Sequence, residues 1–149
     1  MLRLSNNGKR YADLLQRRLD EIVANAVKRD FITPVSRLTG YTAAFDFSDE
    51  DHWGLPTMDL VKTRAEGTTL AFRYGDTRTI SEGAEYLLPP LMFRPGSSVL
   101  ETLAKSLDQA DRLRVPVETL LLDRQFFDVD TVNFLRGRGL QYNMPETTA

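Results

Sequence analysis

A short apolar run that ends abruptly in an acid lies late in the chain. Residues 117–122 read Val-Glu-Thr-Leu-Leu-Leu, and Asp123 follows them directly. The run is too short for an independent helix, and its Leu and Val content predicts a strand buried on both faces. Asp123 would then lie at the carboxyl end of a central strand, where open α/β sheets gather their ligands. The rest of the chain must therefore supply the neighbouring strands.

Hydrophobic periodicity and turn residues predict a helix first and then a mixture of strands and helices. Apolar residues at three- and four-residue spacing predict a helix over residues 8–28, whose apolar face must pack on something. Ser97 or Ser98 is expected to cap the second helix, with Glu101 completing a capping box. Gly75-Asp76 reads as a turn, and residues 55–66 read as irregular. The further predicted elements are strands 41–47, 68–74 with possible pairing over 77–81, 85–93, 117–123 and 140–144, and a helix over 129–138 that begins at Asp128 or Asp130 and ends at Gly137/Gly139.

This succession predicts an α/β fold. One helix precedes the order β-β-β-α-β-α-β, which fits a mixed sheet with helices on its faces. It is the succession of a ribonuclease H-like fold. We expect residues 1–39 to form an N-terminal helix and connector, and residues 40–149 to form the ribonuclease H-like unit.

Composition excludes several classes of protein. The 149 residues include no Cys, so disulfides and thiolate metal sites are excluded. No apolar run of about 20 residues occurs, and the first residues lack the apolar core of a signal peptide, so we expect a cytoplasmic protein with no membrane partner. The net charge of −2 gives no general attraction to nucleic acid. The acidic, Lys-poor composition suggests a GC-rich or salt-adapted host.

Two acids, Asp46 and Asp123, are the candidate catalytic and metal-binding residues. Each lies near the end of a predicted strand, and those two strands are neighbours in a ribonuclease H-like sheet. Adjacent ionised carboxylates repel each other, and a divalent cation between them removes the repulsion. Oxygen-only ligands select Mg²⁺ or Mn²⁺. Simpler interpretations stay open for both acids. Asp123 could cap the following turn. Asp49 or Asp51 could be the metal ligand in place of Asp46, or the whole acidic stretch could be a solvated loop.

Several segments resemble those of DDE insertion-sequence transposases, especially the halobacterial, archaeal type. The segment Leu-Leu-Leu-Asp-Arg-Gln-Phe-Phe-Asp-Val-Asp at 120–130 is similar to the region around that family's second catalytic Asp. The stretch 45–54 resembles the first Asp segment, 67–74 resembles a Gly-Thr-x-x-Ala-Phe-Arg-Tyr strand, and 141–145 matches the strand after the second Asp. The resemblance covers roughly residues 40–145.

The resemblance implies metal-dependent cleavage and strand transfer of DNA at transposon ends, with two Mg²⁺ or Mn²⁺ ions. The family's two metal-binding Asp positions correspond to Asp46 and Asp123, and Arg73 and Arg124 are candidates for contacts to DNA phosphate, unless each pairs with a nearby acid. The family's third residue is a Glu on a helix well beyond the last strand, and Glu146 lies too close to that strand. We therefore expect a truncated catalytic domain that is inactive alone. The alternatives are a non-catalytic remnant that pairs with a full-length transposase, and a nuclease that uses a further acid such as Asp49 or Asp128.

Overall fold

The computed structural model describes residues 6–30, 40–56, 59–62, 70–80 and 85–145, and within the first helix it describes the side chains of residues 13–26. The predicted connector over 31–39, the start of the predicted strand at 68, the residues around Ser81, and Glu146 lie outside the described residues. The elements in chain order are α1 Asn6–Asp30, β1 Tyr41–Asp51, β2 Val61–Lys62, β3 Leu70–Thr79, β4 Leu91–Phe93, α2 Val99–Arg112, β5 Val117–Leu122, the short 3₁₀ helix η2 Arg124–Phe126, α3 Val129–Gly137 and β6 Gln141–Asn143.

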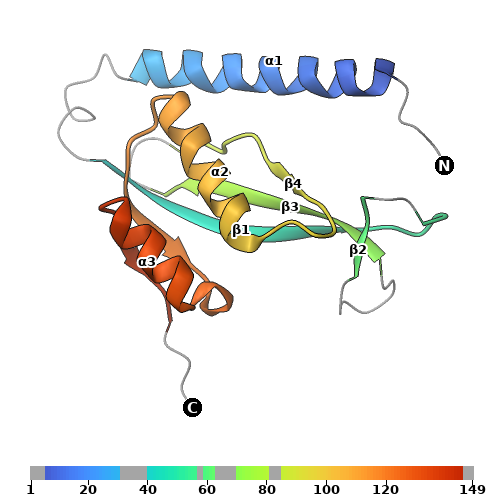
Figure 1. Cartoon of the computed structure of the whole chain (residues 1–149). Coiled ribbons are helices and arrows are strands. Elements are labelled where there is room, and N and C mark those ends of the chain that lie inside the picture. Colours follow the sequence, from blue (N-terminus) through green and yellow to red (C-terminus); the bar gives the residue numbers. More distant parts are fainter. Residues whose placement is uncertain (1–5, 31–39, 57–58, 63–69, 81–84, 146–149) are drawn as a thin grey trace.

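The strands form one mixed sheet in the order β2-β3-β1-β5-β6, with β4 also pairing with β3 (Figure 1). β1 and β3 are antiparallel, whereas β1 with β5 and β5 with β6 are parallel. Strands close together in sequence thus form the antiparallel half of the sheet. The parallel strands β5 and β6 are each preceded by a crossover helix, α2 and α3 respectively. This is a ribonuclease H-like sheet, and it confirms the predicted fold class.

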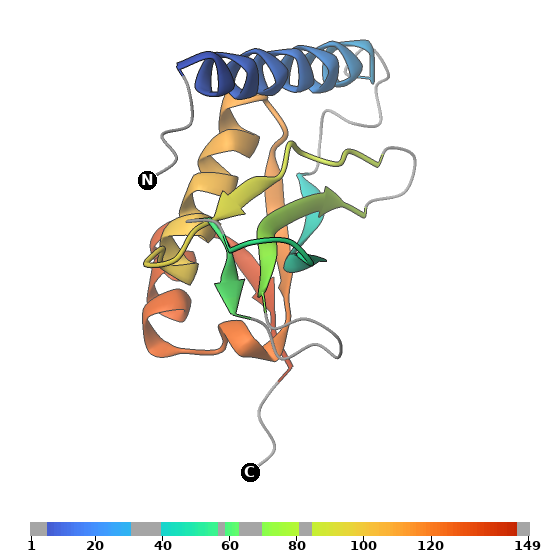
Figure 2. The same cartoon turned by 90° about the vertical axis from the view of Figure 1, so that its right-hand side faces the viewer.

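The two crossover helices α2 and α3 lie on the same side of the sheet (Figure 2). They cover a core whose buried residues are Ala43, Phe45, Leu103, Leu107, Leu120, Leu122, Phe126, Leu135 and Met144. The prediction that the central run is buried on both faces is wrong: Leu120 and Leu122 are buried under the helices, whereas Thr119 and Leu121 on the other face are only half-buried. No helix of the described residues covers that second face.

Strand β1 is longer than its sequence predicts. It continues through the acidic stretch to Asp51, because residues 43–51 pair with β3 along their whole length. The predicted turn at Gly75-Asp76 is also wrong, since both residues lie inside β3. A side chain at Gly75 would meet the Phe45 ring at 3.0 Å and the Thr102 methyl at 3.0 Å. Glycine is therefore needed here for packing between strand and helix, not for a turn.

The helix boundaries follow the predicted caps. The Ser98 hydroxyl accepts a hydrogen bond from the Glu101 N–H (3.4 Å), and the Asp128 carboxylate accepts one from the Thr131 N–H (2.8 Å). Gly139 follows α3 with a φ of 69°, a left-handed conformation that glycine adopts without strain. Of the strand predicted over 85–93, only Leu91–Phe93 forms a strand, and Leu87 makes an isolated bridge to Arg78. The short β2 was not predicted.

Helix α1 contacts the rest of the molecule through one edge of its apolar stripe. Val23, Ala24 and Ala26 pack on a second cluster, built from Tyr41, Tyr86, Leu88, Ala110, Leu113 and Val115. Asp20 accepts a hydrogen bond from Arg112 on α2 at 2.6 Å. The middle of the stripe is exposed, with Leu14 and Leu15 each at 54% and Ile22 at 65%. None of the described helices is long and apolar enough to span a membrane.

Candidate functional site

The two predicted acids follow a pair of residues that lie in register. Phe45 of β1 and Leu122 of β5 are parallel partners, and Asp46 and Asp123 are the next residue of each strand. Because neighbouring strands lie about 4.8 Å apart, the two acids lie side by side. Asp123 directly follows the end of β5, but Asp46 lies in the middle of β1, so the prediction that Asp46 lies near the end of its strand is wrong. Both are exposed, whereas Phe45 and Leu122 are buried. A separation of 77 residues in sequence therefore becomes adjacency in the sheet.

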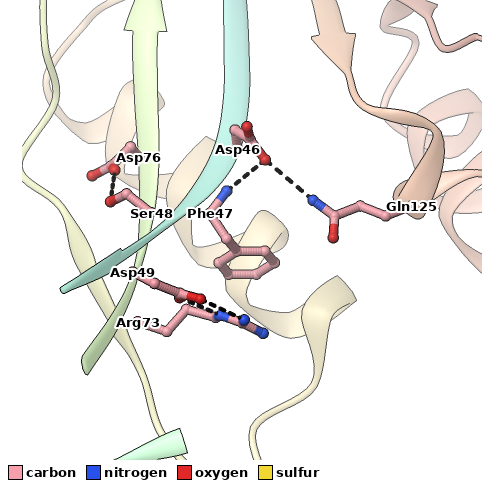
Figure 3. Close-up of polar contacts among 7 residues, drawn as sticks. All are labelled: Asp46, Phe47, Ser48, Asp49, Arg73, Asp76 and Gln125. Atoms are coloured by element: carbon pink, nitrogen blue, oxygen red, sulfur yellow. Dashed lines mark hydrogen bonds and ion pairs between the residues drawn. The ribbon is translucent and has the colours of Figure 1, made fainter. Parts of the chain in front are cut away.

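The carboxylate of Asp46 is held through one of its oxygens. Oδ1 accepts a hydrogen bond from the Phe47 N–H (2.8 Å) and another from the Gln125 side-chain amide (3.1 Å), as Figure 3 shows. None of the described residues hydrogen-bonds to Oδ2. One oxygen is thus fixed by two donors, and the other is available for a ligand.

Asp123 has a similar arrangement. Its Oδ1 accepts a hydrogen bond from the N–H of Arg124 at 2.7 Å, which makes Asp123 the N-cap of η2. The interpretation of Asp123 as a turn cap is therefore correct. Its second oxygen has no hydrogen-bond partner among the described residues, so capping leaves one oxygen of Asp123 available for a ligand.

The turn η2 is anchored by Phe126, which is fully buried. The Phe126 ring packs against Phe45 with ring centroids 5.5 Å apart and against Phe47 with centroids 5.7 Å apart. These two residues flank Asp46 in β1. A single aromatic side chain thus ties the turn that begins at Asp123 to the strand segment that carries Asp46. Such contacts favour a fixed relative placement of the two acids.

A third acid lies beside Asp46 in the sheet. Asp76 of β3 is the direct antiparallel partner of Asp46. Its carboxylate accepts a hydrogen bond from the Ser48 hydroxyl (Figure 3). Two like charges directly opposite each other in a sheet repel. Asp46, Asp76 and Asp123 therefore make this region of the sheet negatively charged.

Arg73 pairs with an acid of the same region. Its guanidinium donates two hydrogen bonds to Asp49, at 2.7 Å and 2.8 Å (Figure 3). The hydrogen bonds to Asp49 raise the pKa of Arg73 above its ordinary value. Of the two roles that the sequence left open for Arg73, pairing with an acid is the one present here. Arg124 is exposed, and no described acid contacts its guanidinium.

Two of the other candidate acids, Asp49 and Asp128, have local partners. Asp49 is engaged by Arg73, and Asp128 caps α3 through both the N–H and the hydroxyl of Thr131, each at 2.8 Å. The hydrogen bond from the Thr131 N–H, above all, lowers the pKa of Asp128. No group of three potential metal-ligating side chains occurs in the described parts of the chain.

The donor set at Asp46 and Asp123 suits a hard divalent cation. Both acids offer carboxylate oxygens only, and each has one oxygen without a hydrogen-bond partner in the described structure. Oxygen ligands of this kind are those of Mg²⁺ and Mn²⁺, which keep several water ligands and need few from the protein. The residues present therefore fit such an ion, with the protein filling a minority of its coordination positions.

Comparison with known proteins identifies no family. No protein-family model matches the sequence, and no curated protein matches it. Among solved structures, the chain is similar to the Mos1 transposase paired-end complex with left transposon end, with a TM-score of 0.43 and 11% sequence identity. The alignment covers 85% of this chain and 40% of the transposase chain, so this chain spans less than half of that protein. The match assigns neither a family nor an activity.

Three side chains at this end of the sheet were not predicted from the sequence. Gln125 lies between Arg124 and the Phe pair, and no local pattern indicates that its amide reaches β1. Asp76 was read as part of a turn, although the alternation over 70–79 continues through it. Ser48 begins the acidic stretch, for which a solvated loop was one of the interpretations left open. Each becomes visible only when the β1–β3 and β1–β5 registers are known.

Proposed function

We propose that this chain carries part of the catalytic domain of a DDE transposase, in which Asp46 and Asp123 bind Mg²⁺ or Mn²⁺. The observation that carries the proposal is the parallel register of Phe45 and Leu122 on neighbouring strands, because Asp46 and Asp123 are the residues that follow them. The resemblance of residues 120–130 to the second Asp segment of these transposases supports it. The activity of the lineage is metal-dependent cleavage and strand transfer of transposon-end DNA.

The residues of the site have distinct roles in this proposal. Asp46 and Asp123 would hold the cation, since the first carboxylate oxygen of each is hydrogen-bonded to a backbone N–H group and the second is available for a ligand. A cation held there would polarise a phosphodiester and lower the pKa of a bound water. Arg124, exposed next to Asp123, would contact a DNA phosphate in this proposal. Arg73 can do so only after it releases Asp49.

The expected strength of the site is modest. Asp46 and Asp123 are the two ligands of this proposal, and Asp76 opposite Asp46 already accepts a hydrogen bond from Ser48. Two carboxylates give few protein ligands, so we propose weak cation binding and no transposition by this chain alone. The net charge of −2 also predicts weak binding to DNA in the absence of a cation. A third carboxylate ligand would have to be Asp76, or come from residues outside the described part or from another protein.

A non-catalytic role is the second candidate, and the exposed apolar stripe of α1 favours it. Leu14, Leu15, Leu19 and Ile22 are each more than two-fifths exposed. Exposed apolar side chains at helical spacing suit contact with another protein. In this alternative the chain pairs with a full-length transposase, and Asp46 and Asp123 are retained from an ancestral transposase but have no catalytic role.

Titration with Mn²⁺ tests the cation site. We expect the wild-type chain to bind Mn²⁺ in calorimetry, and Asp123→Ala and Asp46→Asn each to abolish the binding. Asp130→Ala is the matched control, because Asp130 is an exposed acid close by in sequence that lies on α3. Equal binding by the wild type and Asp123→Ala would contradict the proposal.

Nicking of supercoiled DNA separates the two candidates and the nuclease alternative. The proposal predicts that this chain alone does not nick DNA in Mn²⁺. Nicking that disappears in Asp46→Ala would instead identify a self-sufficient nuclease. A chain that neither binds Mn²⁺ nor nicks DNA, but co-purifies with a full-length transposase, would support the non-catalytic role.

A further inference from the structure

We infer that Gln125 is a positioning residue that determines which divalent cations Asp46 can accept. The inference rests on the proposed cation site and adds to it a cause of cation selectivity. It starts from the contact between the Gln125 amide of η2 and Asp46 Oδ1 of β1, at 3.1 Å (Figure 3). Gln125 does not itself ligate the cation.

The contact changes the number of lone pairs that Asp46 can offer. A carboxylate has about four lone-pair sites, two on each oxygen. The Phe47 N–H and the Gln125 amide both donate to Oδ1, so both of its sites are taken. Oδ2 keeps both sites open. Asp46 is therefore prepared to bind a cation through one oxygen only.

The position of Gln125 is fixed by the residues on either side of it. Asp123 caps the start of η2, and the Phe126 N–H donates to the Asp123 carbonyl at 3.0 Å. Phe126, the next residue, is fully buried between β1 and the helices. The backbone of Gln125 therefore has little freedom, and its side chain needs only a rotamer choice to reach Asp46.

Binding through one oxygen discriminates between cations by size. Mg²⁺ and Mn²⁺ take octahedral sets of oxygen ligands and commonly use carboxylates through a single oxygen. Ca²⁺ takes about 6–8 oxygens and gains from a carboxylate that binds through both. With Oδ1 occupied, Asp46 can give Mg²⁺ or Mn²⁺ the single oxygen that these ions commonly take, but it cannot bind Ca²⁺ through both oxygens. Loss of the Gln125 amide would release one site on Oδ1 and favour Ca²⁺.

The test compares Mn²⁺ and Ca²⁺ binding in Gln125→Met, which keeps the length of the side chain and removes both amide donors. Gln141→Met is the matched control, because Gln141 is exposed on β6. We expect the ratio of Ca²⁺ to Mn²⁺ affinity to rise about tenfold in Gln125→Met, the low end of what changes beside metal ligands produce, and to stay unchanged in the control. Equal shifts for both ions, or no shift, would overturn the inference.

A measurement without any cation tests the contact separately. The side-chain amide protons of Gln125 should exchange with water more slowly than those of Gln141 in NMR spectra, and Asp46→Ala should remove the difference. No difference in the wild type would overturn the positioning role. A wild-type chain that binds neither cation would overturn the cation site and the selectivity together. Mn²⁺ binding that Asp123→Ala abolishes, with no change of the ratio in Gln125→Met, would overturn the selectivity alone.

Discussion

Asp46 and Asp76 lie directly opposite each other on the antiparallel strands β1 and β3. Each carboxylate has its own donors: Gln125 and the Phe47 N–H hold Asp46, and the Ser48 hydroxyl holds Asp76. These hydrogen bonds offset part of the repulsion between two acids that face the same side of the sheet. In the absence of a cation, the remaining repulsion between Asp46 and Asp76 therefore lowers the stability of the folded chain.

Removal of one charge of this pair should stabilise the protein. In Asp76→Asn the side-chain oxygen can still accept from Ser48, while the repulsion with Asp46 is lost. We expect the free energy of unfolding to rise by about 0.2–1 kcal/mol in urea titrations at low ionic strength, and the gain to shrink at high salt. A gain that did not depend on salt would point to another cause.

Phe126 should be among the most important core residues, because it joins η2 to both neighbours of Asp46. Phe126→Ala is expected to lower the free energy of unfolding by about 3–5 kcal/mol, measured by urea denaturation. The adjacent Phe127 is 47% exposed, so Phe127→Ala is the matched control and should cost clearly less. Similar losses in the two variants would contradict the role of Phe126 as the anchor.

Asp128 should give α3 a stability that depends on pH. The hydrogen bond from the Thr131 N–H lowers the pKa of Asp128 below its ordinary value. The ionised cap therefore contributes fully above the pKa of an unfolded Asp, about 3.9, and its contribution is lost as the pH falls through the lower, folded value. Asp128→Ala should cost about 1 kcal/mol at neutral pH, and the cost should become smaller in acid.

Unfolding of this variant and the wild type between pH 7 and pH 2 would measure the effect. Asp130→Ala is the control, since Asp130 lies in the first turn of the same helix without capping it. A difference between Asp128→Ala and the wild type that was the same at pH 7 and at the lowest pH would show that ionisation of the cap does not contribute to it.

If Arg73 contacts DNA as in the proposed function, its pairing with the Asp49 carboxylate should limit that contact. Asp49→Asn removes the charge that holds the guanidinium and should raise the affinity for DNA at low salt. Asp51→Asn removes a charge of the same strand, but Asp51 makes no ion pair with Arg73. In fluorescence anisotropy we expect the larger gain in Asp49→Asn, with a steeper dependence on salt. Equal gains would mean that only the net charge matters.

Local signals were sufficient for the helices and for the order of the strands. Ser98 and Asp128 start their helices because a side-chain oxygen satisfies N–H groups only a few residues away, and such a signal is complete within a short stretch of sequence. The apolar run at 117–122 likewise carries its own pattern. The resulting order of elements was enough to predict the ribonuclease H-like sheet and the adjacency of Asp46 and Asp123.

Features that depend on distant partners could not be predicted. β1 continues to Asp51 because β3 lies beside it, although the acidic stretch alone has low strand propensity. Gly75 reads as a turn residue, but glycine is needed there because a side chain would clash with the Phe45 ring and the Thr102 methyl. The amide of Gln125 reaches Asp46 across 79 residues of sequence. Such contacts follow from register, which local composition does not encode.

The length of β1 has a consequence for how copies of this chain meet. β5 pairs with β1 only as far as Phe45, so from Phe47 to Asp51 that side of β1 has no strand partner among the described residues. Open strand edges are templates for the growth of sheets between molecules. Here the edge carries Asp49, Glu50 and Asp51, and pairing two such edges would bring carboxylates together. These acidic side chains therefore disfavour pairing of this strand edge with a second copy of the chain.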